Sequence, residues 1–259
     1  MIDLPNEYFC EHRTHSYTQW VLENGASAVG LPGGFVAAND TGCQPELLST
    51  SDALQRLARL RAATAALGNA PLIFACTAAR EGFALACDDD PRDQRFMTGA
   101  RTADGFSAYC GGIDGCIGRA TEYARYSDVL CFRASRLDWS DAERFAASVR
   151  EHCPGKRLGF CFAPAPAELH WSARDHVAFE KKLRQMGYHY YFFTQLGSTV
   201  FHSFPSDQPW IYVDDRTKSA TVESEDLNDL FARLILPTIR FDELERRRVP
   251  SHRPETAGF

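Results

Sequence analysis

The chain has 259 residues, with 28 lysines and arginines against 34 aspartates and glutamates, which gives a formal net charge of −6. That length suffices for one large domain with a hydrophobic core. The acidic surplus and the mixing of both signs exclude a nucleic-acid-binding protein, because such proteins need a basic stripe. No apolar run approaches the ~20 residues that cross a bilayer, so no membrane partner is expected.

The cysteines point to a reducing compartment. The chain has nine of them, an odd number, and no two have the C-x-x-C spacing. The first ten residues lack the charged segment and the following apolar stretch that are typical of a signal peptide. Reduced thiols and a cytoplasmic location are therefore expected.

Five short apolar runs are bounded by turn-forming or polar residues, as buried parallel strands are. Helical segments with one polar face lie between them. This alternation predicts an α/β fold with a parallel sheet. The five predicted strands cover residues 26–31, 71–76, 128–132, 157–162 and 190–194.

The predicted helices follow apolar spacing and end signals. A three-to-four spacing of apolar residues predicts a helix over 51–67, with Ser51 as its cap and Gly68 after its end. Ser140 and Glu143 form a capping box that opens a helix to about residue 152. Residues 80–100 are expected to be an irregular acidic excursion. Further helices are predicted over 17–24, 114–126, 172–186, 224–236 and 240–248.

The most specific signal lies between residues 90 and 106. Asp90-Pro91-Arg92-Asp93 is followed by Phe96-Met97-Thr98-Gly99-Ala100-Arg101-Thr102 and then by Gly105-Phe106. These segments resemble the Asp-Pro-x-Asp, Phe-Ile-Thr-Gly-Glu-Arg-Thr and Glu-Gly-Phe motifs of the isocitrate lyase family, in the same order. The likeness continues to about Phe204. The chain is thus identified as a member of the isocitrate lyase and phosphoenolpyruvate mutase superfamily.

The resemblance implies a TIM-like (β/α) barrel over residues 1–204. A C-terminal helical extension over 205–259 would then pack on the barrel or on a partner. A closed barrel of this kind needs eight strands, and the family places two of them before the point where this chain begins. The barrel is therefore expected to be incomplete at its N-terminal side. Residues 1–20, the C-terminal tail or a second chain would cover the open edge.

The resemblance also indicates what the family's chemistry requires. Isocitrate lyases cleave isocitrate to glyoxylate and succinate. They use Mg²⁺ held by acidic residues and a proton-donating cysteine in a Lys-Lys-Cys-Gly-His loop. The family's metal-binding Glu-Asp falls here on Pro32-Gly33, so no metal cofactor is expected. The cysteine loop falls on a degenerate segment that keeps only the glycine convincingly, namely Asp40, Thr41, Gly42 and Cys43.

The same comparison indicates a vestigial substrate pocket. An arginine that clamps a carboxylate in the family is replaced by Cys76, and a glutamate at the end of the next strand by Arg133. The family's Asn-Cys-Ser-Pro-Ser loop reads Cys161-Phe162-Ala163-Pro164-Ala165. Thr77 and Thr194 keep the threonines of the family. The pocket is therefore expected to comprise Cys76, Thr77, Arg133, Cys161, Ala163, Ala165 and Thr194.

Three functions are open at this point. The prediction is a non-catalytic subunit that binds a copy of itself or an intact isocitrate lyase, because residues that fix the shape are kept while residues that bind anions or metal are replaced. The second is an enzyme that acts on a small carboxylate through a thiol pocket of Cys76 and Cys161, although inert packing is the favoured interpretation of these thiols. The third is a carbon–carbon lyase completed by strands of a partner chain, against which Ala163 and Ala165 argue.

Overall fold

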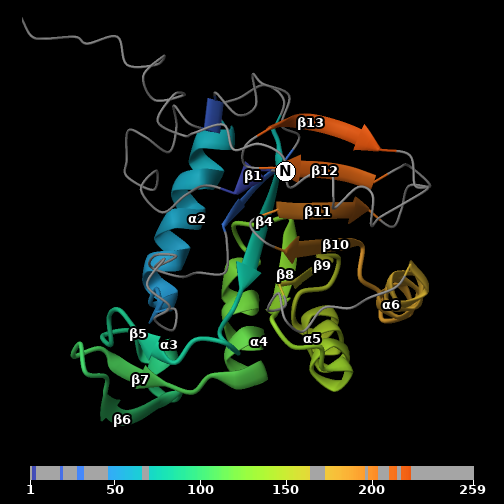
Figure 1. The fold of residues 1–259 in the computed structure, drawn as a ribbon. Coiled ribbons are helices and arrows are strands. Elements are labelled where there is room, and N and C mark those ends of the chain that lie inside the picture. The colour runs from blue at the N-terminus through green and yellow to red at the C-terminus, as the bar shows by residue number, and fades with distance from the viewer. Residues whose placement is uncertain are drawn as a thin grey trace, which may run out of the picture.

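The computed structural model of the chain describes residues 2–3, 18–19, 28–31, 46–65, 70–163, 173–195, 198–203, 210–214 and 217–222. Strands and helices alternate along the chain as the sequence predicts (Figure 1). Their order is β1 (Ile2–Asp3), β2 (Ala28–Leu31), β3 (Glu46–Leu47), α2 (Thr50–Ala65), β4 (Leu72–Thr77), β5 (Ala84–Leu85), α3 (Pro91–Gln94), β6 (Met97–Arg101), β7 (Ser107–Tyr109), α4 (Gly112–Tyr123), β8 (Val129–Ala134), α5 (Trp139–His152), β9 (Arg157–Phe162), α6 (Ala173–Gln185), β10 (Tyr190–Gln195), β11 (Ser198–Ser203), β12 (Trp210–Asp214) and β13 (Thr217–Val222).

A curled sheet of nine strands forms the main layer, in the order β1-β2-β4-β8-β9-β10-β11-β12-β13. All neighbours from β1 to β10 are parallel. The last three strands add to β10 as an antiparallel meander. Within the described residues the sheet ends at β1 and β13 and does not close on itself. The expected incomplete barrel is therefore confirmed as a parallel half-barrel, extended on one side by antiparallel strands.

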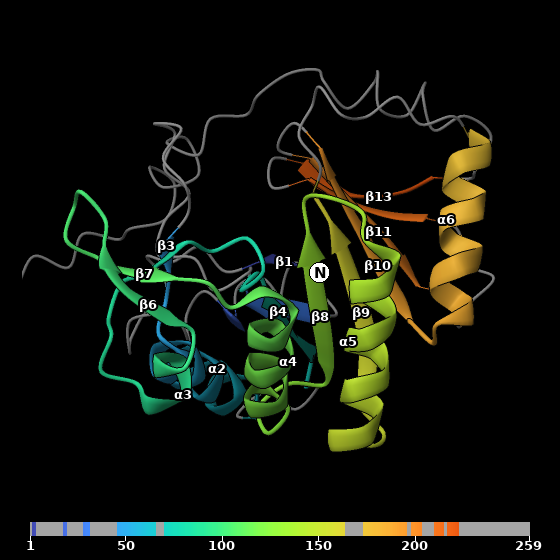
Figure 2. The ribbon, with the colours of Figure 1, turned by 90° about the horizontal axis from the view of Figure 1, so that it is seen from below.

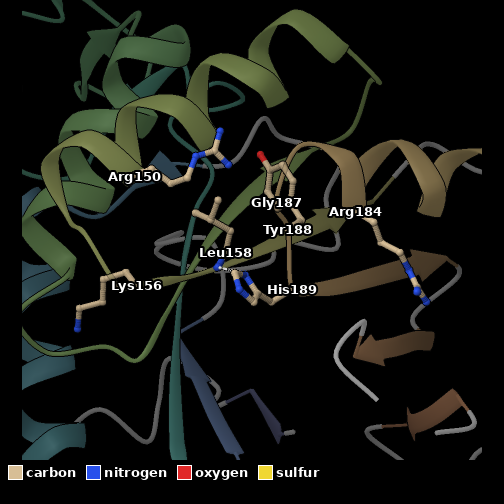
Figure 3. A pocket seen from close by; sticks show the side chains of 8 residues that line it. Arg150, Lys156, Leu158, Arg184, Gly187, Tyr188 and His189 are labelled. Atoms are coloured by element: carbon tan, nitrogen blue, oxygen red, sulfur yellow. Dashed lines mark hydrogen bonds between the residues drawn. The ribbon is translucent and has the colours of Figure 1, made fainter. Parts of the chain in front are cut away.

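Helices cover the outer face of this sheet (Figure 2). Helix α4 lies against β4 and contacts both α2 and α5. The carboxyl ends of the parallel strands meet at one edge of the sheet, and the loops that lead from helices into strands meet at the other. At this second edge, a pocket of about 600 Å³ lies beside the starts of β9 and β10 (Figure 3).

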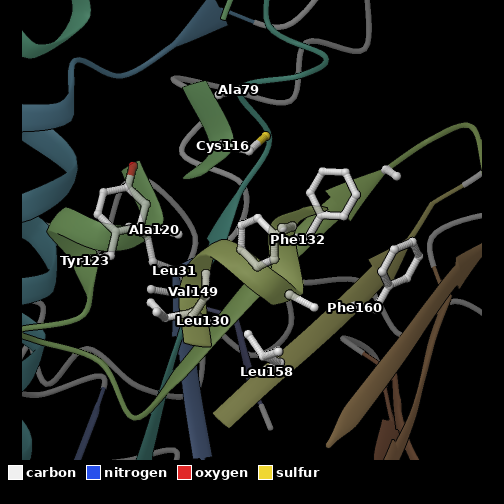
Figure 4. Close-up of a cluster of buried hydrophobic side chains, with 14 of the residues drawn as sticks. Leu31, Ala79, Cys116, Ala120, Tyr123, Leu130, Phe132, Val149, Leu158 and Phe160 are labelled. Carbon is white, nitrogen blue, oxygen red and sulfur yellow. The ribbon is translucent and has the colours of Figure 1, made fainter. Parts of the chain in front are cut away.

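The larger hydrophobic core lies between the helices and the sheet (Figure 4). Phe132 of β8 stacks on Phe145 of α5, with ring centroids 5.2 Å apart. Alternate residues of the strands point to the opposite, concave face, as the two-residue period of a strand requires. There they form a second cluster of Ala28, Phe74, Val129, Cys131, Tyr190 and Phe192.

Two predicted helix caps are wrong. Helix α2 begins at Thr50 because Ser49, rather than Ser51, caps it: Ser49 Oγ accepts from Asp52 N at 3.0 Å and donates to the Asp52 carboxylate at 2.8 Å. Helix α5 begins at Trp139 because the Asp138 carboxylate accepts hydrogen bonds from two backbone N–H groups of the first turn. A charged acceptor at the positive end of a helix is favoured over a hydroxyl two residues later.

Other segments also differ from the prediction. The expected irregular excursion over 80–100 instead contributes to a second sheet of four short strands, in the order β3-β5-β7-β6. Beyond residue 204 the main sheet continues with β12 and β13, which the sequence did not predict. The helices expected over 224–236 and 240–248 lie outside the described residues, and only residues 18–19 of the helix expected over 17–24 are described.

Candidate functional site

The carboxyl ends of β4, β8 and β9 bring together four of the predicted pocket residues. In the sheet register Cys76 pairs with Cys131, and Arg133 pairs with Cys161. Thr77 is the last residue of β4 and is buried. Cys76, Thr77, Arg133 and Cys161 therefore lie at one edge of the sheet, where the active sites of (β/α) barrels form.

The two thiols of this edge face the concave side. Cys76 and Cys161 are half-buried and pack against the concave cluster. A hydrogen bond with Cys161, together with burial, raises the pKa of the Cys76 thiol well above its usual range. Cys76 is consequently a protonated thiol at neutral pH, and a protonated thiol is a poor nucleophile.

Arg133 has an acidic partner that the sequence did not reveal. Its Nε lies 3.5 Å from Oε2 of Glu81, and the two side chains are only 28% and 15% exposed. Glu81 follows β4, in a turn closed by a hydrogen bond from Glu81 N to Ala78 O at 2.9 Å. A carboxylate ligand at Arg133 would have to compete with this internal carboxylate.

The other acids near this edge are also paired. Arg80 Nε lies 2.5 Å from Asp141 Oδ2, and Arg80 Nη2 lies 3.4 Å from Asp138 Oδ2. Many metal ions in proteins are held by several side chains that converge on one point, although Mg²⁺ can rely on one or two carboxylates together with waters. Across the part of the chain that the structure describes, no three His, Cys, Asp or Glu side chains converge in this way.

The remaining predicted residues are placed only in part. Ala163 is half-buried, and its N–H donates to Ala134 O at 3.0 Å, so it continues the line of β9 beside β8. Thr194 lies in β10 and pairs with Thr199 of β11, and its side chain is not described. Ala165 and the degenerate cysteine loop Asp40, Thr41, Gly42 and Cys43 lie outside the described residues.

The Asp-Pro-x-Asp motif builds the scaffold. Asp93 accepts hydrogen bonds from Thr50 N at 2.6 Å and from Thr50 Oγ1 at 2.8 Å, and its Oδ1 lies 3.0 Å from Arg119 Nη2. Asp90 accepts from Ser51 N at 2.6 Å and pairs with Arg92. The motif thus satisfies the first N–H groups of α2 and joins that helix to α4 through a buried ion pair.

Comparison with known proteins shows which family the chain belongs to. The profile described as "Isocitrate lyase family" matches residues 73–207, which is more than half of the chain. The chain belongs to the isocitrate lyase family. An isocitrate lyase of Halalkalibacterium halodurans is 32% identical over 71% of this chain and 43% of its own length. One of Salmonella typhimurium is 32% identical over 68% of this chain and 42% of its own length.

The chain thus spans less than half the length of these family members. A crystal structure of 2,3-dimethylmalate lyase, a member of the PEP mutase/isocitrate lyase superfamily, is 14% identical, with a TM-score of 0.47 over 72% of this chain and 50% of that one. In the described part of the chain, no helix is long and apolar enough to span a membrane.

Proposed function

We propose that this member of the isocitrate lyase family has lost the carbon–carbon lyase reaction and acts by binding, as a subunit that associates with a copy of itself or with an intact isocitrate lyase. The observation that carries the proposal is the Arg133–Glu81 ion pair at the carboxyl edge of the sheet. Where the family holds metal-binding acids and carboxylate clamps, this chain has thiols, an alanine and an arginine already paired with an internal carboxylate.

Each of these replacements removes a group that could stabilise the transition state of the lyase reaction. Loss of one preorganised donor costs about 10²–10³ in rate. Cys76 and Ala163 cannot clamp a carboxylate with a charged or amide donor, and Arg133 is partly neutralised by Glu81. Several such losses together leave no route to the transition state of the lyase. The loss of activity is proposed on this ground.

The described half-barrel, by contrast, is held together by buried contacts, which supports a binding role. The buried Asp93–Arg119 pair joins helix α4 to the start of α2, and Ser49 and Asp138 cap helices α2 and α5. Within the described residues the sheet also ends at β1 without closing into a barrel. An open edge of this kind favours association with another chain.

Association can be tested by mixing the purified protein with an intact isocitrate lyase and measuring the mass of the product by light scattering after size exclusion. The proposal predicts either a homo-oligomer or a mixed complex. A protein that stays monomeric at all concentrations, alone and with the lyase, would contradict it.

The thiol pocket remains the alternative function, an enzyme acting on a small carboxylate through Cys76 and Cys161. The raised pKa of Cys76 weighs against it, because a nucleophilic cysteine needs its thiolate at neutral pH. Labelling with iodoacetamide near pH 7.5 and peptide mass spectrometry would decide. Faster labelling of Cys76 than of the exposed Cys110 would favour the thiol enzyme; slower labelling would support the binding role.

A further inference from the structure

Three cysteines of neighbouring parallel strands share the concave face of the half-barrel near its carboxyl edge. Cys76 of β4 and Cys131 of β8 are partners in the sheet register. Cys161 of β9 lies further along, as the partner of Arg133 of β8. Register partners point to the same face of a sheet, and all three cysteines pack in the concave cluster. The described residues thus gather three thiols in one part of this face.

The thiols of Cys76 and Cys161 contact each other. A hydrogen bond joins them although β8 lies between their strands. The curl of the sheet explains this contact, because inward-pointing side chains of alternate strands in a barrel share one layer. An S–H···S hydrogen bond leaves one proton between two sulfur atoms that both carry lone pairs. A cation that prefers sulfur can take the place of that proton.

The same spacing prevents a disulfide between Cys76 and Cys161. Strands that are two apart in a sheet are separated by roughly 9–10 Å, whereas a disulfide needs Cα atoms within about 7 Å of each other. Cys131 lies to one side, because its Sγ would be 2.5 Å from a Cβ added at Gly159 of β9, and the glycine leaves room for it. The Cys76 and Cys161 thiols are therefore placed to hold an ion between them.

The number and kind of donors favour a soft monovalent cation. Structural Zn²⁺ is almost always bound by four ligands, and in the described residues no three His, Cys, Asp or Glu side chains converge. Thiolate sulfur selects Cu⁺, which forms linear complexes with two sulfur ligands. Two thiolates and one Cu⁺ carry a net charge of −1. Arg133, the register partner of Cys161, lowers the pKa of Cys76 and so favours negative charge at this position.

We propose that Cys76 and Cys161 form a two-coordinate binding site for Cu⁺ on the concave face. Two thiols and one Cu⁺ give a dithiolate complex of charge −1 and release two protons to solvent, with no change of oxidation state. Both residues are only half-buried, so the ion can reach them. Because the ligands must lose their protons, binding should strengthen as the pH rises. The site uses these thiols as ligands, is independent of the association proposed above and needs no lyase activity.

The test is titration of the reduced full chain with Cu⁺ under argon, in competition with the chromogenic chelator bathocuproine disulfonate. We expect one Cu⁺ per chain to be retained against the chelator. Cys76→Ala and Cys161→Ala should each weaken this binding by at least about 100-fold, since loss of a mere hydrogen-bond partner of a ligand already costs about 10–100-fold. Circular dichroism verifies that each variant is folded. X-ray absorption of the copper-loaded wild type should show two sulfur ligands, and this measurement holds if a variant fails to fold.

Cys110→Ala is the matched control, because Cys110 is an exposed thiol on the segment between β7 and α4 and is not part of the concave cluster. Its affinity for Cu⁺ should equal that of the wild type. The proposal is overturned if the wild type gives up all its copper to the chelator, or if its copper is bound by nitrogen or oxygen. It is equally overturned if Cys76→Ala or Cys161→Ala binds as tightly as the wild type, or if Cys110→Ala binds as weakly as they do.

Discussion

The buried ion pair between Asp93 and Arg119 should be a main determinant of stability. The two side chains are 1% and 2% exposed, and Asp93 also accepts both hydrogen bonds from Thr50. Arg119 in turn donates to Leu48 O at 2.8 Å. Removal of one partner of a buried pair leaves an uncompensated charge and costs about 3–5 kcal/mol. At roughly 2–4 °C per kcal/mol for a chain of this size, Asp93→Asn should lower Tm by about 6–20 °C.

The assay is thermal and urea unfolding followed by circular dichroism, with Asp114→Asn as the matched control. Asp114 pairs with Arg144 at 2.6 Å, but these side chains are 60% and 54% exposed. An exposed pair contributes only about 0–1 kcal/mol because water and salt screen it. The double variant Asp93→Asn/Arg119→Met should lose less than the sum of its single losses. Equal effects of Asp93→Asn and Asp114→Asn would refute the reasoning.

Two further predictions concern the backbone and the buried tyrosines. Gly187→Ala and Gly99→Ala should each destabilise the protein by roughly 1–2 kcal/mol in urea unfolding, because both residues have positive φ. A Cβ at 187 meets only the far end of the Arg150 side chain, which can move aside, so a much larger loss at 187 than at 99 would contradict this account. Burial raises the pKa of Tyr109 to about 12, against ~10 for a free phenol. The unfolded chain therefore releases this proton first, and stability that is constant below pH ~10 should fall between pH ~10 and 12. Phenolate absorbance near 295 nm measures this, and complete ionisation of the folded protein near pH 10 would contradict it.

Much of the fold was predictable because buried parallel strands have a strong pattern. The apolar runs at 71–76, 128–132, 157–162 and 190–194 correspond to β4, β8, β9 and β10 to within two residues at each end. The helix caps failed because the sequence offers several polar residues close together. Ser49 and Ser51 are both residue types that cap helices. The choice depends on the Asp90 and Asp93 carboxylates, which are about 40 residues away in the sequence. They accept hydrogen bonds from the N–H groups of Ser51 and Thr50, so these groups need no other partner.

The short strands of the second sheet lacked a usable signal. β5 has two residues and β7 three, so no alternation can develop, and β6 is mostly exposed. Strands β12 and β13 depend on pairing with β11, which itself pairs antiparallel with β10. Such a pairing is tertiary information that a local pattern does not contain.

At the candidate site, residue types were predictable but partners were not. The family comparison predicted one pocket containing Cys76, Arg133 and Cys161, and in the sheet register these residues lie at one edge of the sheet. Glu81 was missed because it lies in a turn with no motif around it. A search for an acid just after the strand next to Arg133 would have found it, since neighbouring parallel strands end at the same edge.

Isocitrate cleavage with Mg²⁺, followed as glyoxylate release, tests the loss of lyase chemistry most directly, with an intact isocitrate lyase as the control. We predict no glyoxylate release above background. The protein concentration should be high enough to detect about one thousandth of the control rate, because the loss of a single key donor lowers the rate by up to about 10³. Cleavage within about a thousandfold of the control would contradict the account, because it would mean that other residues, or another chain, rebuild the clamp and the metal site.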